Sequence, residues 1–275
     1  LNGPKGIGKK LFVNHFLNFF YLKESSQPYS LKNYEYNLSN NISKLISSNS
    51  HPNVFKIYKK NDKKIIDIDQ VRHLIQFTNQ TSFNNDRKFI IIENINLLGI
   101  NAANALLKSI EEPNSKIYFI LINNSEFKTL ETIKSRCLEF KLSLLDSEVI
   151  EIVNYYFGNN IYNNINLDYI NYYNSPSFLI SLVNFLESND LSIKETSIED
   201  LLIYVIKNKS YTSDEFIKEY LNLFVELFFY KNINTSKKIS FKIKKYFYLK
   251  LSFVKKYNLD FESFFLEFND KLLSE

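Results

Sequence analysis

The sequence contains few of the residues on which metal centres and disulfide frameworks depend. Among 275 residues it has one cysteine, Cys137, and three histidines, His15, His51 and His73. A single thiol excludes an internal disulfide framework and a four-cysteine zinc site, and the histidines lack the spacing of metal ligands. We therefore expect no metal site in this protein.

Long apolar runs and a strong charge imbalance are also missing. No apolar segment approaches the roughly 20 residues that cross a bilayer, and no basic start followed by an apolar stretch indicates an export signal. We expect a cytoplasmic protein without membrane contact. The net charge of +4 is too small for this length to identify a nucleic-acid-binding protein by itself. The length of 275 residues is sufficient for about two domains.

The first half of the chain alternates between helical and buried-strand patterns. The continuous apolar runs 89–92 and 117–122 are typical of strands that are buried on both faces of a parallel sheet. Good helix formers occupy residues 102–112, and Pro113 ends that helix. The alternation predicts an α/β domain with a parallel sheet. The other expected elements are a helix over residues 11–20 with Leu11, Phe12, Phe16, Leu17 and Phe20 on its apolar face, a short helix within 39–50, a strand over 54–58 and a helix that begins near Asp67 or Asp69.

After about Leu145 the strand patterns stop and helical periodicity takes over. Thr212 and Glu215 have the spacing of a capping box at the start of one such helix. This change predicts a domain boundary near Leu145 and an all-helical second half. The apolar faces expected there are Phe216, Tyr220, Leu223 and Leu227 on one helix, and Ile239, Ile243, Phe247, Leu251 and Val254 on another.

A glycine-rich segment near the start of the chain has the spacing of a phosphate-binding loop. Gly3, Gly8 and Lys9 match the pattern of a glycine, four residues, a glycine and a lysine, with Gly6 between them. In such a loop, backbone N–H groups surround phosphate oxygens and the lysine reaches the terminal phosphates. The next position of the pattern is Ser or Thr, whose hydroxyl holds magnesium, but here it is Lys10. An ammonium group cannot coordinate a cation, so one magnesium ligand is lost.

A second nucleotide motif is expected where the strand 89–92 ends. P-loop ATPases carry an acidic pair there, whereas this chain has Glu93 and Asn94. Glu93 could still reach magnesium indirectly, but the amide of Asn94 cannot accept a proton from an attacking water. We interpret the segment as an ancestral ATP site that no longer turns over and requires no cofactor, with weak binding of ATP or ADP left open. The alternative is a glycine turn and a strand-end carboxylate without function.

Several segments, in order, resemble one known family. Residues 102–113 (Ala-Ala-Asn-Ala-Leu-Leu-Lys-Ser-Ile-Glu-Glu-Pro), His51-Pro52-Asn53, residues 68–72 and Ser135-Arg136-Cys137 resemble motifs of the clamp-loader subunits of bacterial DNA polymerase III, members of the AAA+ superfamily. The first half resembles the family closely and the rest only in helical character. The resemblance implies an AAA+ P-loop domain over residues 1–145, a helical lid over 146–197 and a helical collar for oligomerisation over 198–275. Because a buried strand should lead into the loop and only Leu1 is available for it, we expect the start of this fold to be missing.

The resemblance also implies roles for single residues. In the family, the arginine that corresponds to Arg136 touches the terminal phosphate of ATP held by the neighbouring subunit and stabilises developing charge. The alternative is a surface arginine paired with a nearby carboxylate such as Glu139. Asn123 or Asn124 is a candidate for the phosphate-sensing position, and a plain polar strand end is equally compatible with the sequence. Cys137 is interpreted as a small buried residue, since no histidine partner is evident.

Departures from the family pattern favour one class of its members. The region before His51 lacks the four cysteines that bind zinc in many relatives, and Ser175-Pro176-Ser177-Phe178 stands where active members keep an arginine. Together with Lys10 and Asn94, this favours the delta-prime class over the catalytic gamma/tau class. Implied partners are gamma/tau and delta, with the sliding clamp and primer-template DNA reached through the assembled complex. Two alternatives stay open. The first is an active ATPase of the same superfamily. The second is a stand-alone DNA-binding protein that uses the lysines at 237, 238, 242, 244, 245, 255 and 256. For these lysines we favour a solvated helix face, because their apolar neighbours keep clean helical spacing and the whole sequence is rich in lysine.

Overall fold

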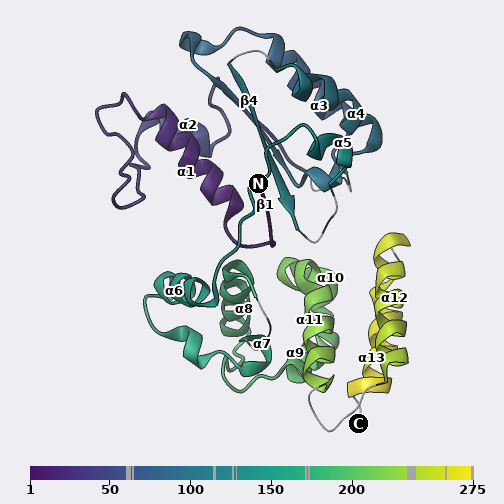
Figure 1. Cartoon of the computed structure of the whole chain (residues 1–275). Helices are drawn as coiled ribbons and strands as arrows, with labels where there is room; N and C mark the ends of the chain where they lie inside the picture. Colours follow the sequence, from purple (N-terminus) through teal and green to yellow (C-terminus); the bar gives the residue numbers. More distant parts are fainter. Residues whose placement is uncertain are drawn as a thin grey trace. The chain divides into compact units, whose positions relative to one another are not determined.

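The chain divides into two units, Leu1–Leu144 and Leu145–Glu275, in the computed structural model (Figure 1). The structure describes residues 1–59, 63, 65–113, 116–125, 127, 129–170, 172, 174–233, 240–257 and 259–273. Over these ranges, no helix combines the length and the apolar character needed to span a bilayer. The further division of the helical part into lid and collar stays a prediction.

A four-stranded parallel sheet forms the centre of the first unit, with the strand order β1-β4-β3-β2. The segment around Lys141 runs parallel to β1 on its other side through a bridge to Asn2. The α/β class with a parallel sheet is confirmed. The strand that leads into the glycine-rich loop includes Asn2 and Gly3, which pair with β4. The expectation that only Leu1 could belong to this strand was therefore wrong. The strands are β1 (Asn2–Gly3), β2 (Val54–Ile57), β3 (Lys88–Glu93) and β4 (Ile117–Asn124).

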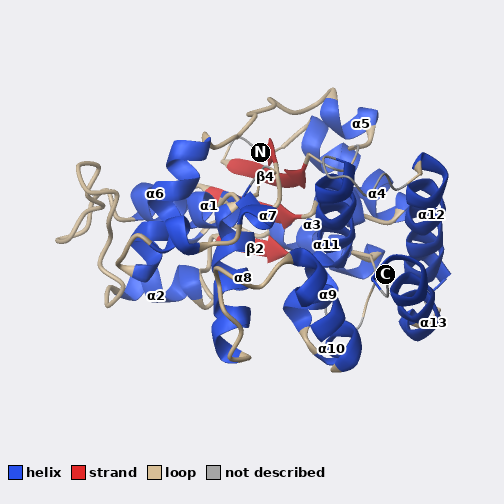
Figure 2. Cartoon of the chain, turned by 90° about the horizontal axis from the view of Figure 1, so that it is seen from below, coloured by secondary structure: helices blue, strands red, loops and turns tan. Residues whose placement is uncertain are grey.

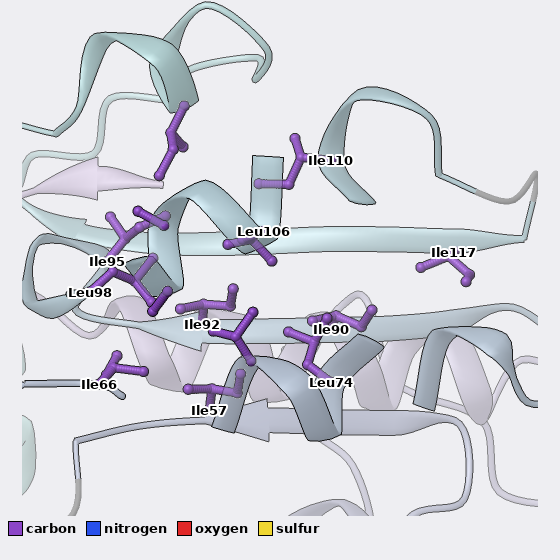
Figure 3. Packing of buried hydrophobic residues seen from close by; sticks show 14 residues of the cluster. Ile57, Ile66, Leu74, Ile90, Ile92, Ile95, Leu98, Leu106, Ile110 and Ile117 are labelled. Atoms are coloured by element: carbon purple, nitrogen blue, oxygen red, sulfur yellow. The ribbon is translucent and has the colours of Figure 1, made fainter. Parts of the chain in front are cut away.

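The central strand β3 is buried on both faces because helices cover the sheet on both sides. Ile90 and Ile92 belong to one apolar cluster, shown in Figure 3, together with residues of α3 and α4. Phe89 and Ile91 belong to a second cluster with residues of α1 and α2. This alternation follows from the two-residue period of a strand and explains the uninterrupted apolar run. The four helices are α1 (Lys9–Tyr21), α2 (Asn41–Ser47), α3 (Ile68–Asn79) and α4 (Ile100–Glu111).

Helix α3 begins as its sequence indicates. The Asp67 carboxylate accepts a hydrogen bond from the backbone N–H of Gln70, and the Gln70 side chain accepts one from the backbone N–H of Asp67. This reciprocal capping satisfies two donors that the first turn leaves without helical partners. Asp67, one of the two predicted start residues, is therefore the N-cap of the helix.

The buried face of α1 differs from the predicted one. Val13 and Leu17 are buried, whereas Leu11 and Phe12 are 59% and 53% exposed. The reason lies at the start of the helix, where the preceding loop directs Lys9 inward and buries it. Positions four and eight residues later lie on the same helix face and follow Lys9 into the core. The prediction that Leu11 and Phe12 face the sheet was wrong.

The second unit contains helices and no strand within its described residues, as Figure 2 shows by colour. One predicted cap was wrong. Thr212 lies inside a short helix, where its hydroxyl donates to the carbonyl of Lys209 at 2.8 Å. The N–H of Ile217 donates instead to the carboxylate of Asp214, which precedes the long helix α11. The helices are α5 (Glu131–Lys134) in the first unit, and α6 (Asp146–Phe157), α7 (Leu167–Ile170), α8 (Pro176–Ser188), α9 (Ile198–Lys207), α10 (Ser210–Ser213), α11 (Glu215–Ile233), α12 (Phe241–Tyr257) and α13 (Phe261–Phe268) in the second.

One lysine joins three helices of the second unit. The Lys231 ammonium of α11 lies 2.8 Å from the Asp168 carboxylate of α7 and 2.5 Å from the Glu199 carboxylate of α9. All three side chains are less than one-third exposed. Such a partly buried network with three members fixes the helices more firmly than an isolated surface pair would.

The end of the chain is held by aromatic packing between α11, α12 and α13. The ring of Phe268 lies 5.1 Å from the rings of both Phe228 and Phe247, and all three side chains are buried. Of the predicted α12 face, Phe247, Leu251 and Val254 are buried and Ile243 is partly exposed, whereas Ile239 lies outside the described residues. The predicted helix and most of its apolar face are therefore present.

Glu267 on α13 provides a prediction about acid stability. Its carboxylate accepts hydrogen bonds from Lys250, Lys271 (2.6 Å) and Tyr246 (2.9 Å), and these bonds, that of Lys250 foremost, lower the pKa of Glu267 to about 2. Because the folded-state pKa lies below the unfolded value of about 4.3, the stabilisation is complete above pH 5 and is lost as the pH falls toward 2. We expect Glu267→Gln to lower the free energy of unfolding at pH 7 by roughly 1 kcal/mol.

The difference between wild type and Glu267→Gln should close when urea unfolding is repeated near pH 2. Glu262→Gln on the same helix is the matched control, since Glu262 pairs with a single lysine, Lys209, at 2.7 Å. A difference that is the same at both pH values would show that the ionised carboxylate is not responsible.

Candidate functional site

The glycine-rich loop lies at the carboxyl end of β1 and leads directly into α1. Gly6 and Gly8 have φ angles of 83° and 90°, a left-handed backbone that favours glycine. Gly3 is fixed for another reason, since a Cβ atom there would lie 2.4 Å from the carbonyl oxygen of Leu142. The Lys9 ammonium donates to the carbonyl oxygens of Gly3 (2.7 Å) and Pro4 (2.5 Å). The lysine that the motif would direct at phosphates is therefore bound to the loop's own backbone.

Lys10 and Glu93 form an ion pair across this edge of the sheet. The Lys10 Nζ lies 2.5 Å from Oε2 of Glu93, and the side chains are 63% and 15% exposed. Our sequence reasoning treated Lys10 only as a lost magnesium ligand and missed this contact. The signal was available, because the carboxyl ends of parallel strands and the loops that follow them meet at the same edge of a sheet.

Asn94 follows Glu93 in a left-handed conformation, with a φ of 53°. Its Oδ1 accepts a hydrogen bond of 3.0 Å from the Asn124 side chain. Asn123 lies on the other face of β4, where its amide donates to Oδ1 of Asn2 and to the carbonyl of Phe127, both at 3.1 Å. Of the two candidates for the phosphate-sensing position, Asn124 therefore contacts the strand-end motif and Asn123 does not.

Arg136 follows the short helix α5, and the hydrogen bonds that it makes within the described part of the chain lie outside the glycine-rich loop. Its Nε donates to the Glu111 carboxylate at 2.6 Å, its guanidinium forms an ion pair with the same carboxylate, and NH1 donates to the carbonyl of Thr132 at 2.8 Å. The alternative interpretation, a surface arginine paired with a carboxylate, agrees with this arrangement, but the partner is Glu111 and not Glu139. Glu139 accepts a hydrogen bond of 2.8 Å from the Asn2 side chain and lies 3.9 Å from the Lys134 ammonium. Arg136 thus lies on the surface, 33% exposed, and is held by one partly exposed carboxylate.

Cys137 is a partly buried thiol, and Ser175 begins a helix. Burial raises the pKa of the Cys137 thiol, which keeps it protonated and unreactive. The Ser175 hydroxyl accepts a hydrogen bond from the N–H of Phe178, with Pro176 in the first turn, so this segment is the N-cap of α8. Within the described ranges, no three His, Cys, Asp or Glu side chains cluster closely enough to hold a metal ion.

The lysines near the C-terminus lie on α12, except that Lys237 and Lys238 fall outside the described residues. Lys244 lies over the ring of Tyr248 at 5.6 Å, and Lys256 lies over that of Tyr257 at 5.0 Å. These contacts are typical of lysines whose apolar stems cover a helix surface.

Comparisons with known proteins give matches that agree with one another. A family model described as "DNA polymerase III, delta subunit" matches residues 1–146. The chain is 33% identical over 139 residues to DNA polymerase III subunit delta' of Pseudomonas aeruginosa and 36% identical over 171 residues to that of Buchnera aphidicola. These alignments cover 50% and 61% of this chain, but 40% and 49% of the relatives. DNA polymerase III subunit gamma of Buchnera aphidicola is 36% identical over 83 residues, 30% of this chain and 23% of that protein. The chain thus spans about half or less of the length of the curated relatives it matches.

Proposed function

Since this chain belongs to the DNA polymerase III delta subunit family, we propose that it is a non-hydrolysing, delta-prime-type clamp-loader subunit that lends Arg136 to a neighbour's ATP site. It takes part in DNA replication in the cytoplasm by scaffolding the loader ring. Its partners are the gamma/tau and delta subunits. The sliding clamp and primer-template DNA are reached through the assembled complex.

The observation that carries this proposal is the state of the chain's own pocket. Lys10 is paired with Glu93, Lys9 is bound to the loop carbonyls, and the Asn94 amide is paired with Asn124. Hydrolysis requires a magnesium ion that bridges phosphates and a group that orients the attacking water. In this arrangement the groups that would supply both functions are either replaced or paired with one another. The pocket requires no cofactor for its structure, and any binding of ATP or ADP would be weak.

Arg136 is suited to act outside its own pocket. Its hydrogen-bond partners are Glu111, Thr132 and Ser135, and none of them belongs to the glycine-rich loop. A partly exposed ion pair such as the one with Glu111 contributes about 0–1 kcal/mol. Exchanging this carboxylate for a phosphate group of a neighbour would therefore cost little.

Assembly with other subunits is supported by an exposed apolar face of α12. In addition to its buried face, the helix carries a row of exposed apolar side chains at spacings of three and four residues, which places them on one side of a helix. We call this row the α12 stripe. It consists of Tyr246, Leu249, Phe253 and Tyr257.

The purified chain should not hydrolyse ATP, and this is the direct test against an active ATPase of the same superfamily. The expected release of phosphate by the isolated protein equals that of the Lys9→Ala variant, because neither has a competent site. Turnover by the wild-type chain that Lys9→Ala abolishes would establish the ATPase and contradict the proposed function.

A further inference from the structure

The Lys10–Glu93 ion pair occupies the part of the pocket where P-loop ATPases hold their metal. Lys10 stands at the position of the metal-binding hydroxyl, and Glu93 is at the end of β3. The two charged atoms are 2.5 Å apart, and the Glu93 side chain is only 15% exposed. A carboxylate that is largely withdrawn from water needs a counter-charge, and here the counter-charge comes from the chain itself.

A second ammonium group lies within electrostatic range of the same carboxylate. Lys56, on the neighbouring strand β2, donates to Oδ1 of Asn14 at 3.1 Å and to the carbonyl of Ile46 at 3.2 Å. Burial lowers the pKa of Lys56, while the charge of Glu93 raises it and that of Lys10 lowers it further. The charge of Glu93 thus acts on two ammonium groups, and Lys10 is the one that forms the ion pair with it.

These residues do not fit a magnesium ion. Mg²⁺ binds oxygen ligands in octahedral geometry at about 2.0–2.1 Å and usually takes one or two carboxylates from the protein. Glu93 is already bound to an ammonium group, and Oδ1 of Asn94 already accepts a hydrogen bond from Asn124. A divalent cation placed here would also be repelled by both Lys10 and Lys56.

We propose that the Lys10 ammonium is a built-in cation of this pocket, the permanent counter-ion of Glu93 in the place of a divalent metal. The inference rests on the assignment of the loop as a former nucleotide site in the proposed function, and it specifies how that site is maintained. The pocket keeps its shape without metal because the cation is covalently part of α1. Metal is excluded by charge as well as by the missing hydroxyl.

Mn²⁺ is the probe for the first test, with binding to the full chain measured by electron paramagnetic resonance. Wild type and the charge-preserving Lys10→Arg variant should bind no Mn²⁺ at the site. The double variant Lys10→Ser/Asn94→Asp restores a hydroxyl and a carboxylate. It should bind Mn²⁺ at a concentration at least tenfold below the highest one at which wild type shows no binding, and the binding should be lost when Glu93→Gln is added. Site binding by wild type that Glu93→Gln removes would overturn the inference. Failure of the double variant to bind would overturn the role of Lys10 in excluding the metal.

A second test needs no metal and measures the pairing directly. In EDTA, Lys10→Met should destabilise the chain because it leaves Glu93 half-buried without its counter-ion, and adding Glu93→Gln should recover most of the loss. A double-mutant cycle by urea unfolding should give a coupling equivalent to roughly a fivefold change in the folding equilibrium constant. A coupling of zero would overturn the counter-ion role. Neither test involves ATP or another subunit, so both can succeed even if the proposed function is wrong. The proposed function would be contradicted separately, by a reconstituted loader whose ATPase activity is unchanged by Arg136→Ala.

Discussion

Replacing Arg136 with alanine is expected to reduce ATP turnover about 10³-fold at the neighbouring site that receives the arginine. The guanidinium would stabilise negative charge that develops on the transferred phosphate, and alanine offers no substitute. The measurement is the ATPase and clamp-loading activity of a loader reconstituted from all its subunits, with this chain as wild type or variant. Assembly is checked in parallel by size-exclusion chromatography.

Two variants separate a role in trans from a structural role of the same residue. Arg136→Lys keeps the charge but loses the planar fork, so it should recover only part of the activity. Glu111→Gln removes the partner that Arg136 has in this structure and should leave turnover close to wild type, because in the proposed complex that ion pair would be exchanged for a phosphate. If Arg136→Ala assembled normally and hydrolysed ATP at the wild-type rate, the proposed role would be wrong.

Aspartate at two positions of the α12 stripe should weaken assembly by at least about 100-fold, since central apolar contacts of an interface are worth 2 kcal/mol or more each. Leu249 and Phe253 are 48% and 49% exposed. The double variant Leu249→Asp/Phe253→Asp should therefore leave the free energy of unfolding of the isolated chain within about 0.5 kcal/mol of wild type. Sedimentation with the gamma/tau and delta subunits measures the association, and thermal unfolding measures the fold.

Neighbouring positions of α12 supply the controls for this prediction. Ser252→Asp adds a charge to the same helix at an exposed position outside the stripe, and it should assemble normally. Leu251→Ala acts on the buried face and should cost about 2–5 kcal/mol of stability through the cavity it creates. Undiminished association of the Leu249→Asp/Phe253→Asp protein would show that the α12 stripe faces solvent in the complex.

Helices and strands that are determined by a pattern of neighbouring residues could be predicted from the sequence. The run 89–92 became the central strand because both faces of the sheet are covered, and Asp67 caps α3 through a bond to a residue three positions away. The error at Thr212 was also local. Thr212 and Asp214 are both residue types that cap helices. Thr212 lies within the short helix α10, so Asp214 is the residue that caps α11.

Contacts between distant segments were not predictable in the same way. The sequence indicated that Lys10 and Glu93 lie at the same edge of the sheet, but whether they pair depends on how closely the loop after β1 approaches the end of β3. The same limit applies to Arg136. Nearness in the sequence suggests Glu139 as its partner. In the fold, α4 and α5 place Glu111, 25 residues earlier in the chain, beside the guanidinium. Motifs indicate which residues can bind or react, but tertiary packing determines which of these residues contact one another.

The two ion pairs of Lys231 link helices α7, α9 and α11, so a movement of one helix should affect the others. Sliding of α11 past α7 and α9 would pull the Lys231 ammonium away from two carboxylates at once, and the partly buried charges left behind would cost free energy. We therefore expect a small displacement of α11 to be resisted by its ion pairs with α7 and α9. The three helices should then move together rather than singly.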